Sequence, residues 1–171
     1  MPYKVIYIMG VSASGKTTIG QQLSAKIGFP FYDADNFHSS ENITKMNKGL
    51  PLADEDRWPW LEKIHQFVTE QITTGNIIMA CSALKMTYRE LLGRSIEGNC
   101  IWVFLGGDFD TIRERLKNRT GHFMPPGLLN SQFDALEIPT EAILVDVTDT
   151  PATIIDQIIS ITADGGSFSI Y

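Results

Sequence analysis

The chain has 171 residues, of which 43% are hydrophobic and 20% are charged, and this is ordinary for one globular domain with a sizeable core. The formal net charge of −6 argues against a dedicated nucleic-acid binder, because such proteins usually carry an excess of basic residues. No apolar run is long enough to span a bilayer, and the N-terminus MPYKVIYIMG lacks the cleavage region of a signal peptide. We therefore expect a cytoplasmic protein with no membrane partner, in which Cys81 and Cys100 are buried free thiols.

Five short apolar runs predict β-strands, and helix-like segments alternate with them. The strand candidates are rich in β-branched residues, as is typical of parallel strands covered on both faces: residues 4–9, 30–34, 76–82, 100–106 and 142–147. The helix candidates are residues 16–27, about 40–48, 57–74, 85–94, 109–119 and 151–162. This alternation predicts a doubly wound α/β sheet with its ligands at the carboxyl ends of the strands.

Residues 10–17, GVSASGKT, connect the first strand candidate to the first helix candidate and fit the spacing G-x-x-x-x-G-K-[ST]. In this arrangement backbone N–H groups surround a phosphate, since Gly10 and Gly15 can take backbone angles that a β-carbon would block. Lys16 adds a positive charge for the β- and γ-phosphates, and the Thr17 hydroxyl can ligate Mg²⁺. The stretch predicts a nucleotide phosphate site; the alternative is a flexible Gly/Ser linker.

Two aspartates follow the second strand candidate, in the segment DADNFHSSENITKM. Carboxylates beside the phosphate loop suit two roles, so we expect Asp33 in the shell of the magnesium ion and Asp35 as the acceptor of a hydroxyl proton. The alternative for either aspartate is that it caps the next helix or turns the chain.

The same segment continues with His38, Asn42 and Lys45, which would share one face of a helix with Ser39 as its N-cap. This mixture of hydroxyl partners and a cation suits a polyhydroxylated anion better than a flat apolar ring. We therefore expect all three side chains to contact the substrate.

Arg57 lies at the start of the next helix candidate, in PLADEDRWPWLEKI, where the helix dipole disfavours a cation. We interpret this placement as a sign of a bound anion, because the guanidinium fork suits a carboxylate. The alternative is an exposed arginine paired with Asp54. Asp54 or Asp56 would cap this helix, and Pro59 would lie in its first turn.

Two further pairs of basic residues lie four apart. In CSALKMTYRELL, Lys85 and Arg89 would share a helix face after a cap at Ser82, either as substrate contacts or as a solvated basic face. In the segment TIRERLKNRTGH, Arg115 and Arg119 point the same way. Arginines that close over a transferring phosphoryl group stabilise its charge, and this role needs a mobile support. The loop RTGHFMPPG is a candidate lid that would supply it; the alternative is an ordinary surface loop.

Five ordered blocks resemble gluconokinases over nearly the whole chain: GVSASGKT, DADNFHSSEN-x-x-KM, G-x-PL-x-DEDR-x-PWL, CSALK-x-x-YR and GHFMPP-x-LL-x-SQF-x-x-LE. The resemblance implies a fold similar to that of shikimate and nucleoside monophosphate kinases. This is a single three-layer P-loop NTPase domain over residues 1–171, with a parallel five-stranded sheet and helices on both faces. It also implies a substrate-binding region at about 35–60, a mobile lid at about 119–135, and a homodimer that feeds the pentose phosphate route.

The resemblance implies that ATP binds to the phosphate loop, at Gly10, Val11, Ser12, Ala13, Ser14, Gly15, Lys16, Thr17 and Thr18, and we expect Arg115 to contact ATP as well. The expected catalytic residues are Asp35, Lys16 and Arg119, and the expected ligands of Mg²⁺ are Thr17 and Asp33. The expected substrate contacts are Asp35, His38, Asn42, Lys45, Arg57, Lys85, Arg89 and His122. Ala13 stands where many members of the family carry glycine, which is harmless if its φ stays below zero.

The predicted reaction is in-line transfer of the γ-phosphoryl group of Mg·ATP to the 6-hydroxyl of D-gluconate. One alternative is a P-loop kinase that acts on another aldonate, a shikimate-like acid or a nucleoside monophosphate. A different class of alternative is a nucleotide-dependent switch, which would bind ATP without releasing ADP in response to an acceptor.

Overall fold

One parallel sheet of five strands, in the order β2-β3-β1-β4-β5, forms the centre of the computed structural model, which describes residues 3–119 and 125–163. The strands are β1 Val5–Met9, β2 Phe31–Asp33, β3 Ile77–Ala80, β4 Cys100–Gly106 and β5 Ile143–Asp146. All neighbouring strands pair in parallel. The predicted doubly wound α/β fold is therefore confirmed, with each strand inside or equal to its expected range.

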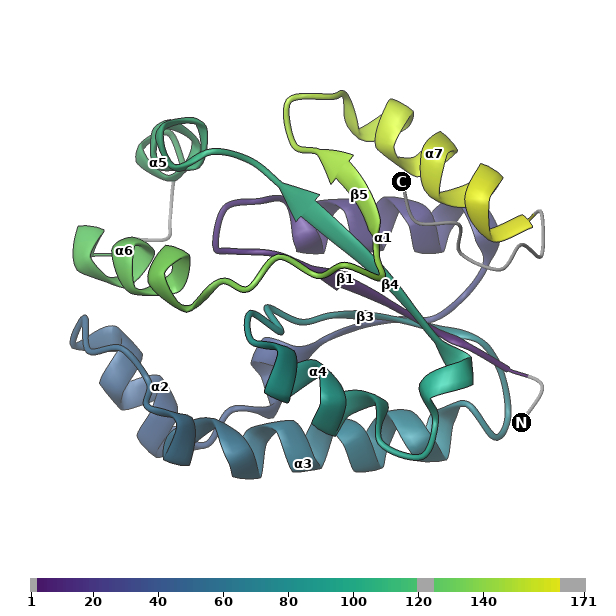
Figure 1. Ribbon diagram of the computed structural model, residues 1–171, viewed down its shortest axis with the longest axis horizontal. Helices are drawn as coiled ribbons and strands as arrows, with labels where there is room; N and C mark the ends of the chain where they lie inside the picture. The colour runs from purple at the N-terminus through teal and green to yellow at the C-terminus, as the bar shows by residue number, and fades with distance from the viewer. Residues whose placement is uncertain (1–2, 120–124, 164–171) are drawn as a thin grey trace.

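Seven α-helices surround the sheet in the described residues: α1 Lys16–Ile27, α2 Ser40–Asn47, α3 Asp54–Gln71, α4 Met86–Gly93, α5 Phe109–Lys117, α6 Pro126–Ala135 and α7 Pro151–Ala163. Short 3₁₀ helices lie at η1 Ala34–Phe37 and η2 Glu97–Asn99. Helices α1 and α7 cover one face, and α3 and α4 cover the other (Figure 1). Helices α2, α5 and α6 lie beyond the carboxyl ends of the strands.

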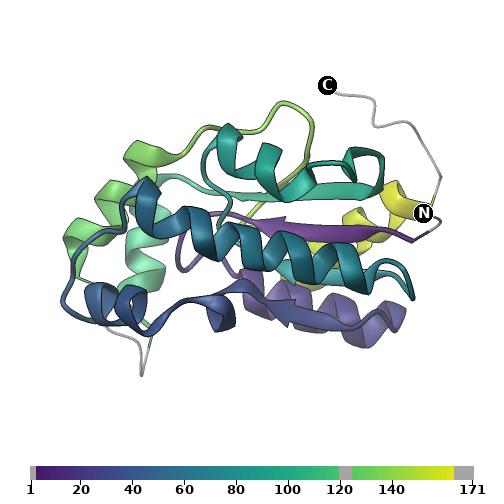
Figure 2. The same ribbon diagram turned by 90° about the horizontal axis from the view of Figure 1, so that it is seen from below.

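Successive side chains of each strand point to opposite faces, so the sheet separates two hydrophobic cores. Ile6 and Ile8 of β1 belong to the core with α1 and α7. Val5, Tyr7 and Met9 belong to the core with α3 and α4, on the face of the sheet that is turned toward the viewer in Figure 2. Burial on both faces explains why β1 is apolar at every position.

Helix α3 begins at Asp54, three residues before its predicted start, so the expected position of Pro59 in the first turn is wrong. Three consecutive acidic residues favour the positive end of the helix dipole and extend the helix toward its N-terminus. Ala53 is the N-cap, and the Asp56 carboxylate accepts a hydrogen bond from the backbone N–H of Ala53 at 2.9 Å. Similarly, α4 has Lys85 and not Ser82 as its N-cap.

Helix α6 is absent from the predicted helices, because Pro125 is its N-cap and the helix itself begins with Pro126 and Gly127. Proline at the first helical position costs nothing, since its missing N–H would have no partner there. Leu128 and Leu129 are buried and attach the helix to the rest of the molecule. Half of the expected lid is therefore a packed helix, and residues 120–124 of that lid lie outside the described residues.

Both cysteines are free thiols, as expected. Cys81 is buried and Cys100 is half-buried, and burial raises the pKa of each thiol to about 12. Neither is a reactive thiolate near neutral pH. In the part of the chain that the structure describes, no helix combines the length and apolar character needed to cross a membrane.

Candidate active site

The phosphate loop runs from β1 to the start of α1 and depends on two glycines. Gly15 is the N-cap of α1 and has a φ of 99°, in the region that side chains disfavour. At Gly10, with a φ of 151°, an added β-carbon would lie 2.8 Å from Ser14 Oγ and 3.0 Å from the carbonyl oxygen of Leu105. Glycine is thus required at both positions, and the loop curls so that α1 presents its N-terminus to an anion.

Ala13 has a φ of 62°, so the condition under which alanine would be harmless at this position, a negative φ, is not met. The tight curl of the loop needs a left-handed residue at this point. For a residue with a β-carbon this conformation costs roughly 1–2 kcal/mol. The phosphate loop therefore contains backbone strain that glycine at the same position would avoid.

A cavity of about 240 Å³ opens beside the loop. Its ten lining residues come from the loop and α1, from the end of β2, and from the end of α5: Ser12, Ala13, Gly15, Lys16, Thr17, Thr18, Asp33, Asp35, Arg115 and Arg119. All ten are among the residues expected to bind ATP or magnesium or to act in catalysis. Val11 and Ser14, which are also expected to bind ATP, do not line the cavity and are buried.

Oxygen ligands for a divalent cation lie together at this cavity. Thr17 Oγ1 donates a hydrogen bond to Asp33 Oδ2 at 2.9 Å, and Asp33 Oδ1 accepts one from the backbone N–H of Asp35 at 3.0 Å. Mg²⁺ prefers hard oxygen ligands and is usually held by one or two protein groups together with substrate phosphates. Thr17 and Asp33 fit that requirement.

Asp35 and Lys16 both line this cavity, and the pKa values of both side chains are shifted. Burial and then the neighbouring charge of Asp33 raise the pKa of Asp35, while Lys16 and Arg119 oppose the rise. Burial lowers the pKa of Lys16, and the charge of Asp35 is the largest opposing influence. Lys16 Nζ donates a hydrogen bond to the carbonyl oxygen of Val11 at 2.9 Å. The cavity thus combines a carboxylate of raised basicity with cations held for a phosphate.

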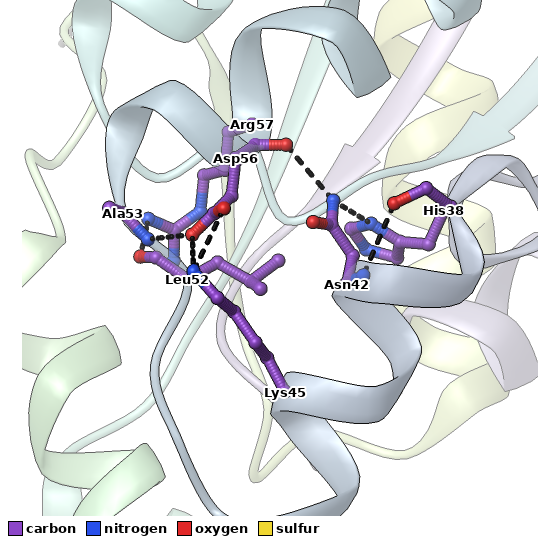
Figure 3. Close-up of polar contacts among 8 residues, drawn as sticks. His38, Asn42, Lys45, Leu52, Ala53, Asp56 and Arg57 are labelled. Carbon is purple, nitrogen blue, oxygen red and sulfur yellow. Dashed lines mark hydrogen bonds and ion pairs between the residues drawn. The ribbon is translucent and has the colours of Figure 1, made fainter.

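A second group of predicted residues lies between α2 and the start of α3 (Figure 3). Lys45 Nζ binds both carboxylate oxygens of Asp56, at 3.0 and 2.8 Å. Asn42 is buried, and its Nδ2 donates to the backbone carbonyl oxygen of Asp56 at 2.9 Å. Ser39 caps α2 as expected, with Oγ accepting from the N–H of Asn42 at 3.1 Å. Lys45 and Asn42 therefore connect α2 to α3, which favours a structural role over the expected substrate contact.

His38 is positioned by an aromatic contact and an amide. Its ring stacks on that of Trp60, with centroids 4.3 Å apart and 13° between the planes. Burial, and then the charge of Arg57, lower the pKa of His38 to about 4. Asn42 Nδ2 lies 3.4 Å from His38 Nδ1 and can donate to it, which leaves the proton of the neutral ring on Nε2. A neutral imidazole suits a sugar hydroxyl better than a carboxylate.

Arg57 lies over Tyr88 beside a second cavity of about 310 Å³. Its Nη1 donates to the carbonyl oxygen of Leu52 at 2.5 Å and to Tyr88 Oη at 3.3 Å. No ion pair of Arg57 with a carboxylate occurs among the described residues, and Asp54 instead binds Lys85 Nζ at 3.0 Å and the Tyr88 hydroxyl. The alternative pairing of Arg57 with Asp54 is therefore absent, and Arg57 keeps a charge that a bound anion can use.

The other basic residues expected in the substrate site have partners in the protein. Lys85 is engaged by Asp54, and it does not share a helix face with Arg89 because α4 begins only at Met86. Arg89 Nη1 donates to the carbonyl oxygens of Ala83 at 2.9 Å and Leu84 at 3.2 Å. It thereby supports the loop after β3, where Ala83 has a φ of 44°. His122 lies outside the described residues.

Two polar residues at the end of the α6 region make contacts that the sequence analysis missed. Gln132 Oε1 accepts from the backbone N–H of Ser12 at 2.7 Å, and Gln132 Nε2 donates to Ser12 Oγ at 2.9 Å. Glu137 Oε2 accepts from the N–H of Met86 at 2.7 Å, and the Glu137 N–H donates to the carbonyl oxygen of Leu84 at 2.9 Å. Both residues lie in the block SQF-x-x-LE, and this block could have marked them as functional candidates. The block alone does not identify the residues that they contact.

Comparisons with known proteins identify the family of this chain. Residues 12–160 match the family model described as shikimate kinase. A relative from Mus musculus named "Probable gluconokinase" is 46% identical over 153 residues, which cover 80% of this chain and 83% of that protein.

Two solved structures resemble the whole fold. The gluconokinase from Sinorhizobium meliloti 1021 has a TM-score of 0.84 and 40% identity, over 95% of this chain and 93% of its own. A sugar kinase from Janibacter sp. HTCC2649 has a TM-score of 0.86 and 40% identity, over 95% of each chain. This chain belongs to the gluconokinase family of shikimate kinase-like P-loop kinases.

Proposed function

We propose that this protein transfers the γ-phosphoryl group of ATP to the 6-hydroxyl of D-gluconate and forms 6-phosphogluconate. The observation that carries the proposal is the cavity that Asp35 shares with Lys16 and Arg119. A carboxylate in the same cavity as phosphate-binding cations is what an alcohol acceptor needs, and the relatives named gluconokinase identify the acceptor.

In this reaction Asp35 orients the acceptor hydroxyl and takes its proton as the new O–P bond forms. Its raised pKa makes it a stronger base than an ordinary aspartate. Lys16 and Arg119 balance the charge on the transferring group and on the leaving β-phosphate. Mg²⁺, held by Thr17 and Asp33, would neutralise phosphate charge when bound.

We assign recognition of the acceptor to Arg57 and His38. Arg57 forms no ion pair with a carboxylate among the described residues and would bind the carboxylate of gluconate. His38, with its pKa lowered to about 4, would exchange hydrogen bonds with a hydroxyl group. These two side chains would be held in place by a surrounding set of residues bonded within the protein: Lys45, Asn42, Lys85 and Arg89.

We also propose that the protein works in the cytoplasm as a homodimer, with Mg²⁺ as its metal, and feeds the pentose phosphate route. These proposals rest on the resemblance of the five sequence blocks to gluconokinases.

A coupled assay of ADP release across candidate acceptors tests the proposed function. We expect ADP release with gluconate to exceed that with shikimate, other aldonates or nucleoside monophosphates. Preference for one of those acceptors would identify a different metabolite kinase. Nucleotide binding with no acceptor-dependent ADP release would instead identify a nucleotide switch.

A further inference from the structure

The amide of Gln132 uses both of its ends on one residue of the phosphate loop. Its oxygen accepts from the backbone N–H of Ser12 at 2.7 Å, and its nitrogen donates to the Ser12 hydroxyl at 2.9 Å. Gln132 and Ser12 are 120 positions apart in the chain. The two bonds fix the position of Ser12 in two directions, which a single bond would not do.

The residue next to Ser12 is the strained one. Ala13 has a φ of 62°, a left-handed conformation that its β-carbon disfavours. A rotation of the backbone at Ser12 and Ala13 that takes Ala13 out of the left-handed region would relieve this strain, and it would also turn loop N–H groups away from the cavity that Ser12 and Ala13 line. The contact from Gln132 opposes that rotation.

Helix α6 is a firm support for this contact, because other parts of the helix region are held independently. Leu129 is buried at 1% exposure, and the Glu137 N–H bonds to the carbonyl oxygen of Leu84 at 2.9 Å. Pro125, at the start of α6, packs so closely on the turn after α2 that a β-carbon at Gly49 would lie 2.8 Å from Pro125 Cγ. Removing the amide of Gln132 would therefore leave the helix in place.

We propose that Gln132 is a positioning residue that holds the phosphate loop in its anion-receiving conformation against the strain at Ala13. With alanine at position 13, two hydrogen bonds from the Gln132 amide on α6 keep the loop in this conformation. Glycine at position 13 would adopt it without strain, so the two hydrogen bonds would be unnecessary. This inference rests on nucleotide binding at the loop, which is part of the proposed function, but not on the identity of the acceptor.

The test is a double-mutant cycle between Gln132→Met and Ala13→Gly. Methionine keeps the length of the side chain and removes both hydrogen bonds. The readout is the Kd of the fluorescent analogue mant-ATP with Mg²⁺ and no acceptor, followed by KM for ATP and kcat. With Ala13 present, we expect Gln132→Met to weaken mant-ATP binding about tenfold, as the loss of two neutral hydrogen bonds implies. With glycine at position 13, the same change should cost less than about twofold.

The kinetic expectation is a raised KM for ATP with kcat at saturating ATP within about twofold, since the loop is reordered once ATP is bound. The matched control is Gln66→Met on α3, because Gln66 bonds only to exposed Glu70 among the described residues. It should leave binding unchanged. A second variant, Ser12→Ala, removes only the hydroxyl contact and should have an intermediate effect.

The inference is overturned if Gln132→Met leaves the Kd unchanged, or if it weakens binding equally in both backgrounds. Thermal unfolding of each variant shows whether a loss of binding is a loss of fold. If the unmodified protein fails to bind mant-ATP, this inference fails together with the nucleotide site. If the coupling is found but gluconate gives no ADP release, only the proposed acceptor is wrong.

Discussion

The phosphate cavity differs in the pairing of its charged groups from the acceptor region, by which we mean His38, Asn42, Lys45, Asp54, Asp56, Arg57 and Lys85. In the cavity, Lys16 and Arg119 share a small space with Asp33 and Asp35, yet none of the four forms an ion pair with another described residue. In the acceptor region, Lys45 is paired with Asp56 and Lys85 with Asp54. Charges that a protein leaves without a close partner are costly and are therefore the better candidates for ligand contacts. The comparison favours Arg57 over Lys45 and Lys85 in the acceptor region.

The largest effect is expected from Asp35→Asn, which keeps the shape of the cavity and removes the base. We expect kcat to fall by about 10²–10⁴-fold. Binding of Mg·ATP, measured with mant-ATP, should remain because the phosphate loop is untouched. Turnover close to that of the unmodified protein would refute the role of Asp35 and remove the functional distinction between the two regions.

A matched pair of variants, Arg57→Met and Lys45→Met, tests which cation of the acceptor region binds the substrate. Loss of a charge-assisted hydrogen bond to a carboxylate should raise KM for gluconate about 10–100-fold in Arg57→Met. Lys45→Met should leave this KM within about threefold and lower the free energy of unfolding by less than about 1 kcal/mol, because it breaks a partly exposed ion pair. Steady-state kinetics and urea unfolding measure both; the reverse ranking of the KM values would contradict the comparison.

The pH dependence of kcat/KM should be governed by the cavity and not by the acceptor histidine. Asp35 must be ionised to act as a base, so activity falls as the pH drops through its pKa. Since that pKa is raised, the fall begins at a higher pH than it would for an ordinary aspartate. His38 has a pKa of about 4 and is neutral above pH 5, so His38→Gln should keep the same acidic limb. A limb that disappears in His38→Gln would show that His38 titrates in the working range.

The smallest effect is expected from Ala13→Gly on the stability of the free protein. Relief of the left-handed strain favours the folded state, and the greater freedom of glycine in the unfolded chain offsets part of the gain. The net change should be an increase of up to about 1 kcal/mol in the free energy of unfolding, measured in urea. A matched change on α1, Ala25→Gly, should destabilise by about 1 kcal/mol, because Ala25 lies inside a helix. Destabilisation by Ala13→Gly would mean that the strain at this position is smaller than the stabilisation lost through the greater freedom of glycine in the unfolded chain.

Much of the phosphate cavity could be predicted because its geometry is local. Gly10, Gly15, Lys16 and Thr17 lie within eight residues, so their spacing alone predicts the loop, although it does not predict the contact from Gln132. The acceptor region is assembled from α2, α3 and α4, so the sequence could list its polar residues but not their partners. Lys45 and Asp56 are eleven residues apart, and Lys85 and Asp54 are 31 apart.

The amino-acid sequence by itself determined the order of strands and helices, the parallel sheet and the phosphate loop, because these follow from periodicity and short-range backbone chemistry. Only the tertiary structure decided which cations are neutralised, where α6 lies, and that Gln132 reaches Ser12. Those outcomes depend on long-range packing, in which several equally polar side chains compete for the same partners and burial selects among them.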